Sequence, residues 1–76
     1  MAELLTWIAQ HLVDDPAAVS VETVEQDDAI VLRLHVAPDD VGKVIGRQGR
    51  IARALRTLVR AGGVRDDRRV VLEIAD

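Results

Sequence analysis

The chain has 76 residues, of which 49% are hydrophobic and 30% charged, with 13 acidic side chains, 10 basic side chains and no cysteine. This length suits one domain, residues 1–76, with one modest core, and the composition is that of a folded globular chain. Disulfides and thiolate metal sites are excluded, so the cytoplasm is the simplest expected location.

The first half of the chain predicts one helix and two strands. Residues 2–13 carry apolar side chains at helical spacing, and residues 14–16, Asp-Asp-Pro, end that pattern. The segment lacks the basic start and long apolar run of a secretory signal. No apolar run in the chain approaches the ~20 residues of a membrane span, so no membrane partner is expected. Residues 19–25 and 29–37 alternate around the polar link 26–28, which predicts an antiparallel hairpin.

The second half predicts two helices and a strand. After Pro38, the side chain of Asp39 or Asp40 is expected to cap a short helix over 41–45. A turn at 46–49 leads into the strongest helix signal, residues 50–61, which Gly62-Gly63 should end. Residues 64–67 form a polar connection, and residues 69–75 alternate as a last strand. The apolar face of the long helix is predicted to be Ile51, Ala54, Leu55 and Leu58.

The element order is therefore α-β-β-α-α-β. The connection through two helices is expected to be a right-handed crossover that returns the last strand parallel to the strand at 29–37. The fold class is α+β, with a mixed three-stranded sheet packed on helices.

Two glycines, Gly46 and Gly49, bracket Arg47 and Gln48 between the two predicted helices. Glycine permits backbone angles that a Cβ forbids and removes side-chain bulk, so a sugar–phosphate chain can lie against the peptide. The first amides of the helix at residue 50 point toward the turn and favour an anion. A Gly-x-x-Gly loop of this kind clamps single-stranded nucleic acid. The alternative is that the glycines only form a corner between helices.

Charge is concentrated around this turn. Residues 43–60 contain six basic residues and no acidic one, whereas the rest of the chain has four basic residues against thirteen acidic. A local basic surface can attract a polyanion despite a net charge of −3, although such a run can also be only a solvated helix face. The candidate binding residues fall into groups by role. Phosphate charge would come from Lys43, Arg47 and Arg50, backbone access from Gly46 and Gly49, and polar contacts from Gln48. The floor of an adjacent groove would be formed by Val44, Ile45 and Ile51, and the basic face would be extended by Arg53, followed by Arg56 and Arg60.

Other chemistries find little support. A phosphate-binding P-loop would need glycine at 37 and Ser or Thr at 44, where the chain has Ala37 and Val44, and the dinucleotide fingerprint does not fit the glycine spacing. His11 and His35 have no catalytic partner at motif spacing, and the paired aspartates fall in predicted connections. We therefore expect no catalysis, no metal and no cofactor.

Trp7, the only aromatic residue, is expected at the core edge or in a protein interface, and its exposure would favour a dimer contact.

Residues 36–57, Val-Ala-Pro-Asp-Asp-Val-Gly-Lys-Val-Ile-Gly-Arg-Gln-Gly-Arg-Ile-Ala-Arg-Ala-Leu-Arg-Thr, resemble the KH motif of the small bacterial RNA-binding proteins called KhpA. The likeness extends to both ends of the chain, at Leu4, Leu5, Val13, Asp14, Pro16 and residues 69–74. It implies a type II (prokaryotic) KH fold and a cytoplasmic, non-catalytic RNA chaperone or post-transcriptional regulator that holds single-stranded RNA.

The resemblance also implies partners. KhpA proteins form a homodimer or pair with a second KH protein, KhpB, and are linked to cell shape, cell wall organisation and division. An alternative of a different class is a protein-interaction adapter whose KH fold acts mainly through a partner protein. The acidic composition outside residues 43–60 supports that alternative.

Overall fold

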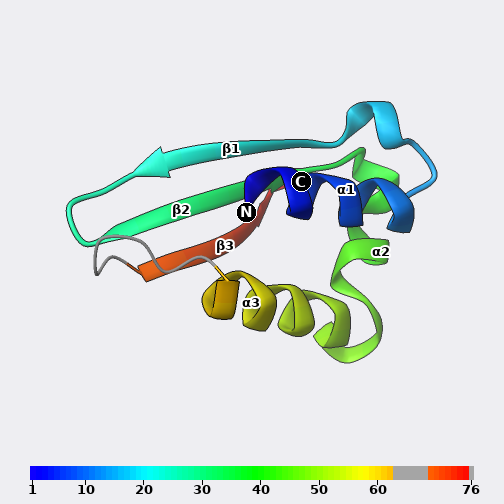
Figure 1. The fold of residues 1–76 in the computed structure, drawn as a ribbon. Coiled ribbons are helices and arrows are strands. Elements are labelled where there is room, and N and C mark those ends of the chain that lie inside the picture. Colours follow the sequence, from blue (N-terminus) through cyan, green and yellow to red (C-terminus); the bar gives the residue numbers. More distant parts are fainter. Residues whose placement is uncertain (63–68, 76) are drawn as a thin grey trace.

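The computed structural model describes residues 1–62 and 69–75, and its elements follow the predicted order (Figure 1). Helix α1 (Ala2–Leu12) is followed by strands β1 (Ser20–Glu25) and β2 (Ala29–His35). Helices α2 (Val41–Ile45) and α3 (Arg50–Gly62) then lead to strand β3 (Arg69–Ala75). Single 3₁₀ turns at Pro16–Ala18, Pro38–Asp40 and Arg47–Gly49 join these elements.

The three strands form one mixed sheet in the order β1-β2-β3. Strand β1 pairs antiparallel with β2, and β3 pairs parallel with β2, so that Leu32 lies between Thr23 and Leu72. The two helices between β2 and β3 provide the crossover that parallel neighbours require. This arrangement confirms the predicted α+β architecture and the parallel return of the last strand.

The core lies between the helices and one face of the sheet. Because side chains alternate along a strand, Leu32 and Leu34 of β2 point into the core while Arg33 and His35 point away from it. Helix α1 packs on β1 and helix α3 on β3, as their positions in Figure 1 show. The largest fully buried side chains come from four different elements, and they are Leu5, Leu34, Val44 and Val59.

Two helix boundaries and two strand boundaries differ slightly from the sequence prediction. Strand β1 begins at Ser20 instead of residue 19. Helix α1 ends at Leu12, and Val13 is already extended. Helix α3 includes Gly62, one residue beyond the expected helical segment. Strand β2 ends at His35 instead of residue 37, because Ser20 and Ala75, the partners of His35, are the last paired residues on either side. The predicted connection at 64–67 and the stop at Gly63 lie outside the described residues.

Two predictions about side chains were wrong. Ala54 is exposed, and Ala52 and Val59 are buried instead, because α3 turns that side toward the sheet and α2. Helix α2 begins without a side-chain capping hydrogen bond, because the carboxylate of Asp40 is engaged by backbone amides elsewhere. Over residues 1–62 and 69–75, the helices are too short or too polar to cross a bilayer.

Candidate nucleic-acid interface

The loop between α2 and α3 has an unusual backbone. Gly46 has φ 76° and ψ 174°, a conformation that is essentially restricted to glycine, and Gly49 has φ 74°. Gln48 between them is left-handed at φ 58° and ψ 26°. The Gly49 N–H donates to the Gly46 carbonyl at 3.1 Å and closes the turn. The chain therefore changes direction within four residues and starts α3 at Arg50.

The two glycines of this loop face different surroundings. A Cβ on Gly46 would lie 2.7 Å from Cγ1 of Ile51, which is closer than two carbon atoms can approach without a shift. A Cβ on Gly49 would meet nothing within 4 Å. Gly46 thus allows α3 to pack against the loop, whereas Gly49 leaves the outer surface of the loop open to a ligand.

The arginines of the basic segment are exposed and have no internal partner. Arg47 lies in the loop, and the others follow along α3. Among the described residues, none of their guanidinium groups forms an ion pair or hydrogen bond. Their positive charge is therefore available to an anion from outside. We call this set the unpaired arginines, and it comprises Arg47, Arg50, Arg53, Arg56 and Arg60.

Lys43 differs from the unpaired arginines because two carboxylates hold its ammonium group. Its Nζ lies 3.0 Å from Oδ2 of Asp14 and 3.4 Å from Oδ1 of Asp40. Hydrogen bonds to Asp14 and then Asp40 raise the pKa of Lys43 above its usual 10.5. The charge that the sequence assigns to phosphate binding is thus already balanced within the molecule.

Asp40 is the one buried charged side chain among the described residues, at 2% exposed. Its Oδ2 accepts the Asp15 N–H at 3.0 Å, and its Oδ1 accepts the Asp14 N–H at 3.3 Å. Burial alone would raise the pKa of Asp40, but the amides of Asp15 and Asp14, together with the Lys43 ammonium, hold it below 3.8. This cluster fastens the segment after α1 to the start of α2, and so it seats the loop that follows α2.

The apolar candidates for a groove floor are not equally accessible. Val44 is fully buried, because it lies on the side of α2 that packs against α3 in the core. Ile45 is 37% exposed, and Ile51 is partly buried against the core. The prediction that Val44 lies in the open floor of the groove beside the loop was therefore wrong. Its side chain supports that surface from beneath, and Ile45 presents apolar area beside the loop.

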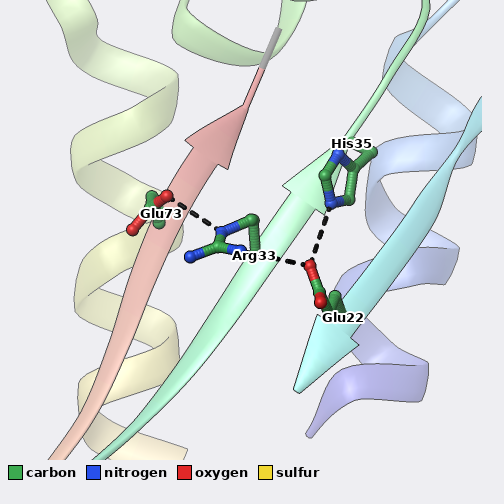
Figure 2. A network of polar contacts seen from close by, with 4 residues as sticks. All are labelled: Glu22, Arg33, His35 and Glu73. Carbon is green, nitrogen blue, oxygen red and sulfur yellow. Dashed lines mark hydrogen bonds and ion pairs between the residues drawn. The ribbon is translucent and has the colours of Figure 1, made fainter. Parts of the chain in front are cut away.

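Outside this segment, the two basic residues that the structure describes, Arg33 and Arg69, are paired. Figure 2 shows Arg33 on the sheet face turned away from the core, held between two acids on the neighbouring strands. Its Nε lies 3.0 Å from Glu73 and its Nη1 lies 3.3 Å from Glu22, with His35 3.4 Å from the same Glu22 oxygen. Glu73 and then Glu22 raise the pKa of Arg33. Arg69 lies 3.9 Å from Asp28.

Trp7 is exposed on α1, at 58%, with its ring 4.2 Å from that of His11. Leu4, one turn earlier on α1, is 45% exposed. Leu4 is one of the apolar residues at helical spacing in residues 2–13, but the buried residues of α1 are Leu5 and Ala9. In the part of the chain that the structure describes, no three His or acidic side chains are grouped in a way that could hold a metal ion.

Comparison with known proteins identifies the family. The model of the KhpA/KhpB KH domain matches residues 2–74. This chain belongs to that family. RNA-binding protein KhpA of Caldanaerobacter subterraneus is 51% identical and that of Clostridium acetobutylicum 53% identical, each over 97% of this chain and 99% of the relative. The KhpA of Listeria monocytogenes is 45% identical over the whole of both chains.

No solved structure gives a significant match to this chain. The family and the observed order of elements nevertheless agree, and together they confirm the KH fold.

Proposed function

We propose that this protein binds single-stranded RNA without catalysing a reaction, and that it holds the RNA backbone at the Gly46–Gly49 loop. The observation that carries the proposal is the loop itself, where an open glycine surface adjoins Arg47 and Arg50, whose charges have no partner among the described residues. The relatives named RNA-binding protein KhpA support the same function.

The loop supplies the interactions that a phosphate backbone needs. The RNA backbone lies over Gly49, where no side chain intervenes, and Arg47 and Arg50 contact phosphates. Gln48 makes polar contacts, and Ile45 offers an apolar surface to a base, with Val44 and Ile51 supporting it. Arg53 begins the basic face that continues along α3 beyond this site. About four nucleotides fit such a loop.

Lys43 contributes less to binding than Arg47 or Arg50. Its ammonium would have to leave Asp14 and Asp40 before it could contact a phosphate. We assign to it mainly the support of α2 beneath the loop.

In the cell, we expect a cytoplasmic RNA chaperone or post-transcriptional regulator with effects on cell shape and cell wall organisation. One loop offers few contacts, so a second KH module would raise the affinity through its effective concentration. This module is a second copy of the chain or a KhpB-type partner. The exposed Leu4 and Trp7 on α1 provide apolar area for that contact.

The double substitution Arg47→Asp/Gln48→Asp tests the proposed site. Both side chains are exposed, and aspartate tolerates the left-handed backbone at position 48, so the melting temperature should stay within a few degrees. Binding to a fluorescent single-stranded RNA should be lost. The matched control is Gln10→Asp/Arg69→Asp, which makes the same change of charge at exposed positions away from the loop. Retained RNA binding by the loop variant would refute the site.

The alternative function is a protein-interaction adapter, and the exposed Leu4 and Trp7 favour it. The same experiment separates the two functions. An adapter would keep its partner after the loop substitutions and lose it after Trp7→Ala. An RNA-binding protein would lose RNA after the loop substitutions, whereas Trp7→Ala would remove only the added affinity from a second KH module.

A further inference from the structure

Helix α3 carries unpaired charge beyond the loop. Arg53, Arg56 and Arg60 are separated by three and four residues, a spacing that places side chains on the same side of a helix. A different side of α3, formed by Ala52, Leu55 and Val59, is buried, whereas Arg53, Arg56 and Arg60 are exposed. We call Arg53, Arg56 and Arg60 the α3 stripe. It begins one turn after the loop and points toward solvent.

The α3 stripe has a cost that a bound anion would relieve. Like charges three or four residues apart on a helix destabilise it. Elsewhere in the described chain an arginine has acidic neighbours, as Arg33 has in Glu22 and Glu73. Helix α3 contains no acidic residue, so its arginines repel one another without compensation. A row of phosphates would supply the missing negative charge.

The dimensions of α3 suit an extended polyanion. At ~1.5 Å per residue, Arg53 and Arg60 at the two ends of the α3 stripe are about 10 Å apart along the helix axis. In a stacked strand the phosphates recur about every 3.4 Å along the strand axis, so a length of three such steps, with about four phosphates, matches the α3 stripe. A strand that leaves the loop along α3 would therefore meet positive charge over a length similar to that held by the loop.

We propose that the α3 stripe binds the phosphates of the RNA segment flanking the one held at the loop, which extends the site from about four to about eight nucleotides. This inference rests on the proposed function, because the loop must hold RNA for the strand to continue along α3. The stripe contacts the backbone alone and adds affinity without reading sequence.

The substitution Arg53→Gln/Arg56→Gln/Arg60→Gln tests the α3 stripe, since glutamine has a helix propensity close to that of arginine. Affinity is measured for single-stranded RNAs of about 5 and about 15 nucleotides over a range of salt. The affinity for the short RNA should fall by no more than about two-fold, because only the long-range electrostatic attraction is weakened. The affinity for the long RNA should fall by up to about 100-fold at ~0.1 M salt. The slope of log affinity against log salt for this RNA should become shallower by about 2.

The control Arg69→Gln removes an exposed charge at the start of β3 and should change neither slope. Equal losses on both RNAs would show a general effect of net charge and overturn the proposal. Unchanged affinity for the long RNA would also overturn it and leave the stripe for an acidic protein partner. The loop variant Arg47→Asp/Gln48→Asp distinguishes the failures, because RNA binding that survives in that variant refutes the proposed function itself.

Discussion

Arg33 on the sheet and Arg47 in the loop carry the same charge in opposite surroundings. Arg33 is held between Glu22 and Glu73 on neighbouring strands, at distances of 3.3 and 3.0 Å. Arg47 has no ion pair among the described residues, and the same is true of the arginines that follow it on α3. One set of charges is satisfied within the molecule, and the other is left for a ligand.

The difference accounts for the proposed binding of RNA by a chain whose net charge is negative. A net charge of −3 describes the whole chain, but a polyanion responds to the charges that remain unpaired near its path. The acids of the sheet face and of the segment after α1 neutralise Arg33 and Lys43, and they lie on elements other than α3. The same division separates the two loop glycines, since Gly46 faces Ile51 and Gly49 faces open space.

The largest effect is expected from Gly46→Ala. The new Cβ would lie 2.7 Å from Ile51, in a backbone conformation that only glycine adopts readily. We expect the free energy of unfolding to fall by about 2 to 4 kcal/mol, measured by denaturant titration. The matched change Gly49→Ala meets only the cost of its positive φ, about 1 kcal/mol, and should act mainly on RNA binding. Equal losses of stability would contradict the distinction.

Asp40→Asn tests the internally satisfied charges. The amide group would turn a donor toward the N–H of Asp14 or Asp15, so we expect the melting temperature to fall by about 10 °C at neutral pH. The folded protein holds the pKa of Asp40 below 3.8. The charged carboxylate therefore makes its full contribution to the free energy of unfolding above pH 3.8, and this contribution is lost as the pH falls through the folded pKa. The gap between the two proteins should therefore narrow in acid below pH 3.8. A constant gap would argue against the role of the charge.

Much of the fold could be predicted from local patterns. The bounds of α2 and β3 agree with the sequence prediction, and the alternation of Val70, Leu72 and Ile74 gives the inward face of β3. The end of β2 could not be predicted, because it depends on where its two neighbours stop. The exposure of Ala54 depends on which side of α3 meets the sheet, and a helical period alone does not specify that direction.

The site was predictable in its composition but not in its pairing. The glycines and arginines are visible in the sequence, whereas the tie between Asp40 and the amide of Asp15 joins residues 25 positions apart. Only the spacing of Asp40 and Lys43 offered a local signal for that cluster. Periodicity also left open which side of the short α2 is buried, so the burial of Val44, which was expected in the floor of a groove, could not be predicted.

The most direct test of the central claim compares Arg47→Gln with Arg33→Gln. Each substitution removes one positive charge, so net charge alone predicts the same effect for both. The measurement is the salt dependence of affinity for one single-stranded RNA. Arg47→Gln should make the slope of log affinity against log salt shallower by about 0.7, the value for one lost phosphate contact on a single strand, and Arg33→Gln should leave it unchanged. The same change in both variants would contradict the claim that the unpaired arginines, and not overall charge, bind the RNA backbone.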